Sequence, residues 1–418
     1  MPTFFSVTSV TLPETAAAAS TLIEWKEAGV AHSALWRSER GAPPPRRIVA
    51  ADDTMAADDA YRLACEGTGL LWRGDFQNAR QMVQALARRI DKPPKASKLA
   101  RVAQKKAADN AASGVPAGQD FHLHRQAQSQ RARVLGMVLI EFGPDYGIEL
   151  RRAPDAKQAC AEAWGAPGEA ARPSVASLRE LLGVISAHEW RKKGVEIAAL
   201  GEAPNNRIHP HYGVFSPVRG EYVDLVANAP LPANPTNGKF VAFDIGTGTG
   251  VLAAVLALRG EVDQVVATDM DPRALECARE NIYGLRLPNP VKVMQADLFP
   301  EGQASVIVCN PPWLPARPGS PLEGAVYDEG SRMLLGFIGG LAAHLAPGGE
   351  GWLILSNFAE KLGLRTRAEL QAAIKAGGLK VLGRIDAKPE HPKAADESNP
   401  LHKARAAEVT SLWRLGAA

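Results

Sequence analysis

The sequence lacks long apolar runs and paired cysteines. No stretch of its 418 residues reaches the roughly 18 to 20 apolar residues that a membrane-spanning helix needs, and residues 1–14 lack a basic segment followed by an apolar one. The four cysteines form no C-x-x-C pair, and their spacing fits neither a zinc site nor a disulfide framework: Cys65, Cys160, Cys277 and Cys309. We therefore expect free thiols, no membrane contact, no metal and a cytoplasmic location.

A strong excess of charge of one sign is also absent, since the formal net charge is +3. This value excludes a polybasic nucleic-acid binder as a description of the whole chain. Basic residues do gather locally, because the segment from Arg73 to Arg133 contains thirteen Lys and Arg residues but only four acidic residues. Such a strip attracts phosphate backbones, but a solvated helix face joined to a linker has the same composition, and we favour that interpretation.

The length suggests about two domains, and the first half of the chain divides into three parts. The spacing of apolar residues predicts helices over 12–29 and over 58–90, the second interrupted at 67–74. Further on, it predicts an apolar strand at 134–142 and a helix at 175–188. The regions we predict are an N-terminal helical region at 1–90, a basic linker at 91–118, an accessory α/β region for substrate recognition at 119–204, and a second domain at 205–418.

After Tyr212 short β-rich runs alternate with helical stretches. We expect helices to begin near Gly250, Pro272, Ser331 and Thr366. This alternation predicts a doubly wound, mostly parallel sheet with helices on both faces. The seven expected strands are 240–245, 264–268, 291–295, 305–309, 351–356, 380–385 and 409–413.

A glycine-rich loop follows the first of these strands. The run from Asp244 to Gly250 has the spacing G-x-G-x-G, with glycines at 246, 248 and 250. Glycines permit a tight turn and let a ligand approach the backbone, and the N-terminus of the following helix offers free N–H groups to an anion. We therefore predict a ligand site formed by Asp244, Gly246, Thr247, Gly248 and Gly250.

Acidic residues stand at the ends of the next two strands. Asp269, followed by Met270, lies about 20 residues after the glycine loop, where the hydroxyls of a ribose need an acceptor. Asp297, followed by Leu298, ends the third strand and can accept a hydrogen bond from an adenine amine. An acid in such a place can also be a helix cap, but two at successive strand ends favour a nucleoside-containing cofactor.

The fourth strand ends in Asn310-Pro311-Pro312-Trp313. The two prolines remove two N–H donors, which leaves backbone carbonyls free as acceptors. Asn310 adds a side-chain carbonyl, and Trp313 adds a flat wall on which a base or amide can stack. Together these residues can hold both hydrogens of a planar NH2 group and direct its lone pair toward a methyl donor, so that positioning supplies much of the rate.

These motifs resemble those of the class I S-adenosylmethionine-dependent methyltransferases, and more narrowly the small-domain group with an Asn-Pro-Pro-aromatic motif. That group includes release-factor glutamine methyltransferases and N-methyltransferases of ribosomal RNA and DNA. The resemblance covers about residues 212–418 and implies a seven-stranded Rossmann-like catalytic domain beside an N-terminal, mainly helical α/β domain. It implies S-adenosylmethionine as cofactor, with its methionine part at Asp244 and the glycines, its ribose at Asp269 and its adenine at Asp297. The target nitrogen would lie at Asn310 to Trp313, although this group more often has Tyr or Phe in place of Trp313.

Two further segments are candidate substrate contacts. Phe215 and Arg219 stand in a Pro-containing segment similar in position to one that enters the cofactor site in glutamine methyltransferases. The connection 387–407 between the last two strands carries His391 and His402 and would form a lid or substrate clamp, with an exposed loop as an equal alternative. We do not expect the two histidines to bind metal.

Three functions remain open from the sequence, and we predict the first, with the second as the main alternative. The first is N-methylation of a nucleobase in RNA, with ribosomal RNA favoured, supported by the basic strip and Trp313. The second is methylation of a glutamine amide in a translation protein, such as a release factor or ribosomal protein, and the residues after Pro312 favour it slightly. The third is a non-catalytic RNA-binding module, which the intact motifs disfavour.

Overall fold

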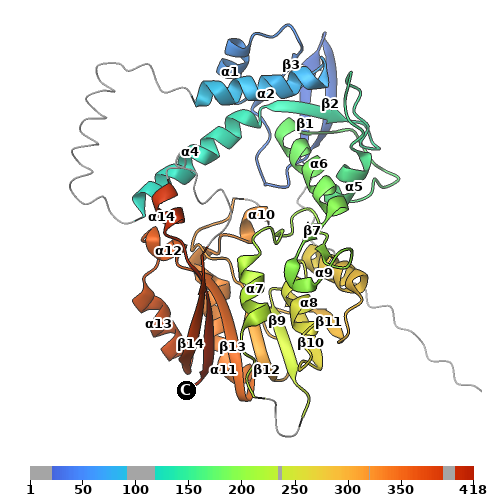
Figure 1. The fold of residues 1–418 in the computed structure, drawn as a ribbon. Helices are drawn as coiled ribbons and strands as arrows, with labels where there is room; N and C mark the ends of the chain where they lie inside the picture. The colour runs from blue at the N-terminus through green and yellow to red at the C-terminus, as the bar shows by residue number, and fades with distance from the viewer. Residues whose placement is uncertain (1–20, 92–117, 234–237, 320, 389–400) are drawn as a thin grey trace, which may run out of the picture.

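A computed structural model describes residues 21–91, 118–233, 238–319, 321–388 and 401–418 of the protein. Two β-sheets dominate it, one in each half of the chain (Figure 1). None of the helices in these ranges has the length and apolar character that crossing a membrane requires. Residues 92–117 of the predicted linker 91–118 lie outside the described residues. His391 also lies outside them.

The N-terminal sheet has six strands in the order β1-β2-β6-β5-β4-β3. Helices cover one of its faces, since side chains of α1, α2, α5 and α6 share a core with one face of β4 and β5. The elements are β1 (Leu22–Glu27), β2 (Val30–Trp36), β3 (Arg47–Ala51), α1 (Ala57–Cys65), β4 (Thr68–Trp72), α2 (Phe76–Ile90), α4 (Gln119–Leu135), β5 (Val138–Phe142), α5 (Lys157–Trp164), β6 (Ser174–Ser177) and α6 (Leu178–Lys193).

The expectation of a helical region at 1–90 is wrong, because four strands lie within it. Residues 22–27, part of the expected helix 12–29, form β1, in which Ile23 and Trp25 are buried between exposed neighbours. That alternation has the period of a strand, and the Ala-rich run before it had suggested a helix. The break expected at 67–74 is the fully buried strand β4.

The C-terminal sheet has seven strands in the order β11-β10-β9-β12-β13-β15-β14. It confirms the seven strands and the four helix starts that the sequence predicts. The elements are β9 (Val241–Ile245), α8 (Val251–Ala257), β10 (Gln264–Asp269), α9 (Pro272–Leu285), β11 (Val291–Gln295), β12 (Ala304–Cys309), α10 (Pro321–Gly324), η2 (Glu329–Ser331), α11 (Arg332–His344), β13 (Leu345–Ser356), α12 (Phe358–Lys361), α13 (Arg367–Ala376), β14 (Leu379–Ala387), α14 (His402–Ala406) and β15 (Thr410–Ala417).

Strand order places the ligand end of this sheet. β9 pairs in parallel with β10 on one side and with β12 on the other. The strands after β9 are first added on one side of it and then, from β12 on, on the other side, so the strand order reverses at β9. In such sheets ligands bind outside the carboxyl ends of the strands at this switch point. The last two strands form the expected antiparallel pair, with β15 antiparallel to β13 as well.

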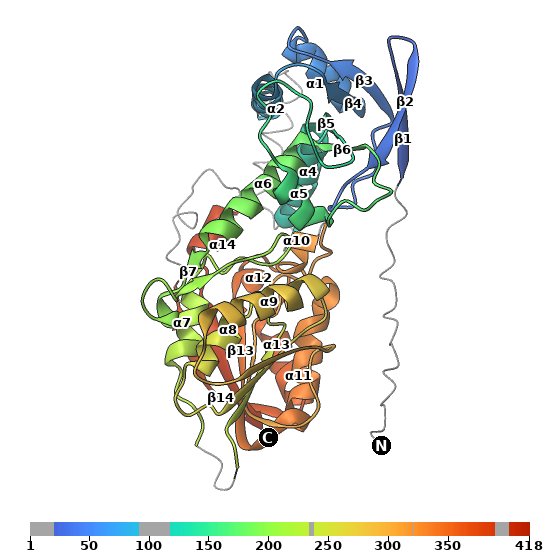
Figure 2. The same ribbon diagram turned by 90° about the vertical axis from the view of Figure 1, so that its right-hand side faces the viewer.

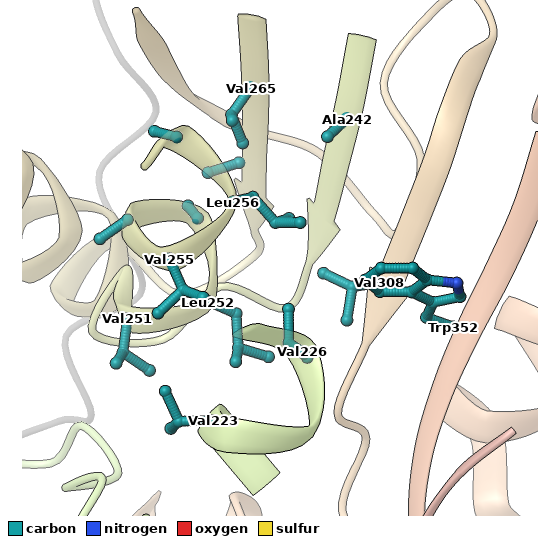
Figure 3. Close-up of a cluster of buried hydrophobic side chains, with 14 of the residues drawn as sticks. Val223, Val226, Ala242, Val251, Leu252, Val255, Leu256, Val265, Val308 and Trp352 are labelled. Carbon is teal, nitrogen blue, oxygen red and sulfur yellow. The ribbon is translucent and has the colours of Figure 1, made fainter. Parts of the chain in front are cut away.

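The core beneath the switch point is built around α8, whose residues 251–257 are all buried (Figure 3). Val255 and Leu256 share a cluster with Val308 of β12 and Trp352 of β13. A helix that is apolar on every side must be enclosed by other elements, and here α7 (Glu221–Asn228) and the sheet enclose it. On the opposite face α11 and α13 pack against the same sheet. The glycine loop is therefore held between two rigid, buried elements.

The two halves contact each other through ion pairs. Figure 2 shows α6 running from the N-terminal sheet toward α9, and Arg191 of α6 lies 2.8 Å from Glu280 of α9. Arg273 of α9 also pairs with Glu39 at 3.0 Å. Between the halves lie β7 (Val195–Glu196), η1 (Ala198–Leu200) and β8 (Arg207–Ile208).

Candidate active site

A pocket of about 590 Å³ opens at the carboxyl ends of β9, β10 and β12. It brings together residues that are far apart in the sequence. The predicted site residues that line it are Phe215, Arg219, Gly246, Thr247, Gly248, Asp269, Met270, Asp297, Leu298, Asn310, Pro311, Pro312 and Trp313. Asp244, Gly250 and His402 do not line it.

The three loop glycines are required for different reasons, although all have positive φ angles: 72° at Gly246, 55° at Gly248 and 82° at Gly250. A Cβ on Gly246 would overlap the terminal methyl of Met333, and one on Gly250 would lie 3.3 Å from the backbone of Ala278. A Cβ on Gly248 would meet nothing within 4 Å, because that side faces the open pocket. The loop thus leaves a space beside its backbone that a ligand can fill.

Asp244 lies beneath the loop and is only 1% exposed. Its Oδ2 accepts hydrogen bonds from the Thr247 hydroxyl at 2.6 Å and from the Ala253 N–H at 3.0 Å. Burial raises the pKa of this carboxyl to about 7. The sequence placed Asp244 at the ligand, whereas here it ties the loop to the start of α8.

Asp269 connects the loop to the end of β10. Its two carboxylate oxygens accept from the N–H groups of Gly248 and Asp271, each at 3.0 Å. Burial raises the pKa of Asp269. A carboxylate has about four acceptor positions, so this one can still accept from ligand hydroxyls at the pocket wall.

Asp297 stands at the exposed rim and lies 2.7 Å from the guanidinium of Arg332, the first residue of α11. Both side chains are more than half exposed, so the pair contributes little stability. The ion pair places the Arg332 guanidinium at the mouth of the pocket, where it also contacts the sulfur of Met270. Sequence reasoning missed Arg332 because only the fold brings α11 to this rim.

Asn310 follows β12, a strand whose residues are all buried. Its Oδ1 accepts a hydrogen bond from the indole N–H of Trp313 at 2.9 Å. Trp313 packs against two core clusters of the domain, so the contact fixes which way the Asn310 amide points. An amide oxygen has two lone pairs, and one remains for a substrate N–H.

Beyond Trp313 the pocket continues to a region where the sequence predicted only Arg219 and the connection 387–407, from which Leu401 and Arg405 line it. Arg219 lies 3.4 Å from Glu408, which is 4% exposed and also accepts from the Ser356 hydroxyl at 2.8 Å. Burial and the charge of Arg405 lower the pKa of His124, which comes from α4. The other residues at this end include Phe121, Leu314, Tyr327, Phe358 and Leu401. His402 lies one residue from this wall, on α14.

Comparison with known proteins assigns the domain. Residues 205–366 match the model of the methyltransferase small domain. These residues belong to the small-domain family of class I S-adenosylmethionine-dependent methyltransferases. The family's cofactor has a carboxylate, a ribose diol and an adenine, and the groups along this pocket fit it: an open glycine backbone at Gly248 and carboxylates at Asp269 and Asp297.

Named relatives match part of the chain. A release factor glutamine methyltransferase of Moorella thermoacetica is 34% identical over 137 residues, which are 31% of this chain and 48% of that protein. The tRNA1(Val) (adenine(37)-N6)-methyltransferase of Glaesserella parasuis is 34% identical over 84 residues, covering 19% of this chain and 35% of that protein. Four release factor glutamine methyltransferases among these relatives are matched over only 25% to 48% of their own lengths.

Among solved structures, the chain is similar to the ribosomal protein L11 methylase of Lactobacillus delbrueckii subsp. bulgaricus. The sequence identity is 15% and the TM-score is 0.33, over 51% of this chain and 88% of that one.

Proposed function

We propose that this chain is an S-adenosylmethionine-dependent N-methyltransferase that methylates the side-chain amide of a glutamine in a translation protein. The observation that carries the proposal is that one pocket is lined both by the glycine loop with Asp269 and by Asn310, whose Oδ1 accepts a hydrogen bond from Trp313. The names of the relatives support the amide as target, since several are release factor glutamine methyltransferases.

The residues of the target end would act by positioning. The free lone pair of Asn310 Oδ1 and the carbonyls left open by the two prolines accept the two N–H groups of the amide, while Trp313 supports its flat face. The bound cofactor supplies an electrophilic methyl group on a sulfonium. The glycine loop and Asp269 would hold this cofactor so that its methyl group could pass to the amide nitrogen, which would then lose its extra proton to water. No strong base is required, because the sulfonium is already a good leaving group.

A second candidate target is the exocyclic amine of a nucleobase, which presents the same planar NH2 group. The relative that methylates adenine in tRNA favours it, as does the local excess of Lys and Arg between Arg73 and Arg133. RNA binding by those residues would weaken steeply with salt, because it depends on release of counterions from phosphates. Recognition of a protein groove would depend on salt much less.

The experiment is methyl transfer from tritiated S-adenosylmethionine into a lysate of cells that lack this protein, separated into protein and RNA. We expect label in one protein band, dependent on Asn310, with Asn310→Ala as the inactive control. Asn310-dependent label in RNA would replace the amide by the nucleobase as target. Absence of label from both fractions, with cofactor still bound by the purified chain, would reject both macromolecular targets.

A further inference from the structure

The target end of the pocket is closed in part by a helix from outside the methyltransferase domain. Phe121 and His124 of α4 line the pocket, although α4 ends 70 residues before the start of the family match. Phe121 is 2% exposed and packs in one cluster with Leu314, Phe358 and Leu401. At its other end α4 is anchored in the N-terminal half, because Leu135 belongs to that core. Figure 1 shows α4 reaching from α2 to α14.

Arg125, one turn after Phe121, fixes α4 to the segment that follows Trp313. Its Nη1 donates to the carbonyl of Arg317 at 2.8 Å, and its Nη2 donates to Glu323 Oε2 at 3.2 Å. The guanidinium also lies 4.1 Å from the centre of the Tyr327 ring, which is the geometry of a cation–π contact. The Arg125 side chain thus contacts both the first part (Arg317) and the second part (Glu323 and Tyr327) of the loop 314–328.

The described residues of this loop, 314–319 and 321–328, are hydrogen-bonded to one another and follow directly after Trp313. The N–H of Leu314 donates to the carbonyl of Val326, and the N–H of Asp328 donates back to the carbonyl of Leu314. Glu323 Oε2 accepts a second hydrogen bond from the Gly319 N–H at 2.9 Å. Leu314 directly follows Trp313. Contacts that keep this loop in place therefore also keep Trp313 in place at the pocket wall, where the substrate amide is proposed to bind.

We propose that α4 is the substrate-side wall of the active site, with Phe121 determining specificity and Arg125 acting as a positioning residue through the loop 314–328. This inference rests on the proposed function for its substrate, a neutral planar amide. Phe121, Trp313 and Tyr327 give the chamber aromatic walls, which favour a flat neutral group. A protonated amine would instead lose its hydration near the guanidinium groups of Arg219 and Arg405.

The test uses the full-length chain with Arg125→Ala and, as a matched control, Arg131→Ala. Arg131 lies on the same helix and pairs with Asp91 at 2.7 Å, but it contacts neither the loop nor the pocket. The first readout is hydrogen–deuterium exchange of peptides covering 314–328. We expect exchange to rise about tenfold in Arg125→Ala, partial recovery in Arg125→Lys, and no change in Arg131→Ala.

The second readout is methyl transfer to a purified, unmethylated release factor. We expect Arg125→Ala to raise KM for this protein about tenfold while the cofactor Kd stays unchanged. Unchanged exchange in Arg125→Ala would overturn the inference, and so would an unchanged KM with an active wild type. If the wild type transfers no methyl to the release factor, the proposed substrate is wrong, and the exchange result alone decides whether Arg125 positions the loop.

Discussion

Replacing Gly246 by alanine isolates the part of the glycine loop that depends on close packing. Gly246 has a φ of 72°, in the left-handed region that disfavours any side chain, and its Cβ would overlap the terminal methyl of Met333. Met333 also lines the pocket, so the side chain that must move is one that borders the ligand.

The size of the effect has two parts. The left-handed backbone of an alanine costs about 1–2 kcal/mol, which lowers the melting temperature of a domain of this size by about 2–4 °C per kcal/mol. Displacement of Met333 into the pocket adds a loss of cofactor affinity, which we expect to be at least about tenfold, or about 1.4 kcal/mol. Gly348→Ala is the control, because Gly348 has a φ of 76°, has open space around its Cβ and does not line the pocket.

Isothermal titration with S-adenosylmethionine and thermal unfolding would measure both parts. Gly246→Ala should lose stability and affinity, whereas Gly348→Ala should lose only stability. Adding Met333→Ala should remove most of the extra loss of affinity, because the overlap disappears, and a double-mutant cycle would measure that coupling. Wild-type affinity in Gly246→Ala would refute the assignment of this loop to the cofactor.

Three further variants test other parts of the site. Asp269→Ala removes the carboxylate that would accept from the ligand hydroxyls and that also accepts from the N–H groups of Gly248 and Asp271. Because a hydrogen bond to a charged group contributes about 1.5–3 kcal/mol, titration should show the cofactor Kd rising about 10- to 100-fold, and an unchanged Kd would contradict this role. Trp313→Phe keeps an aromatic ring, smaller than the indole, but removes the N–H that orients Asn310. Since one such hydrogen bond contributes about 0.5–1.5 kcal/mol, kcat should fall about 2- to 10-fold with an unchanged cofactor Kd. The pKa of Asp244 is raised to about 7 from its unperturbed value of 3.8. The protonated carboxyl therefore contributes stability that is fully present below pH 3.8 and is lost as the pH rises through 7. Unfolding temperatures from pH 5 to 8 should therefore fall more in the wild type than in Asp244→Asn, and parallel profiles would reject this titration.

The sequence predicted the C-terminal sheet well because its strands and helices are local patterns. β9, β12 and the end of β13 are buried runs of mostly apolar residues. Three of the expected helix starts fall beside a Gly, an Asp-Pro or a Thr cap. β1 was mistaken for helix because an Ala-rich run precedes a strand only six residues long. The predicted boundaries at 90, 118 and 204 remain predictions.

The candidate site was predictable where a motif carries it and not where the fold assembles it. The glycine loop, Asp269 and the Asn310 motif stand in sequence order at strand ends, and the structure brings them to one pocket. Phe121, Arg332 and Glu408 come from separate elements, and no local pattern marks them as neighbours. The roles of Asp244 under the loop and Trp313 on Asn310 also depend on side-chain direction, which spacing does not determine.

Mass spectrometry of a purified, unmethylated release factor, incubated with this chain and S-adenosylmethionine, tests the central claim most directly. The account predicts one added methyl group on a glutamine side-chain amide with the wild type and none with Asn310→Ala. A methyl group on a lysine, or equal methylation by Asn310→Ala, would contradict it.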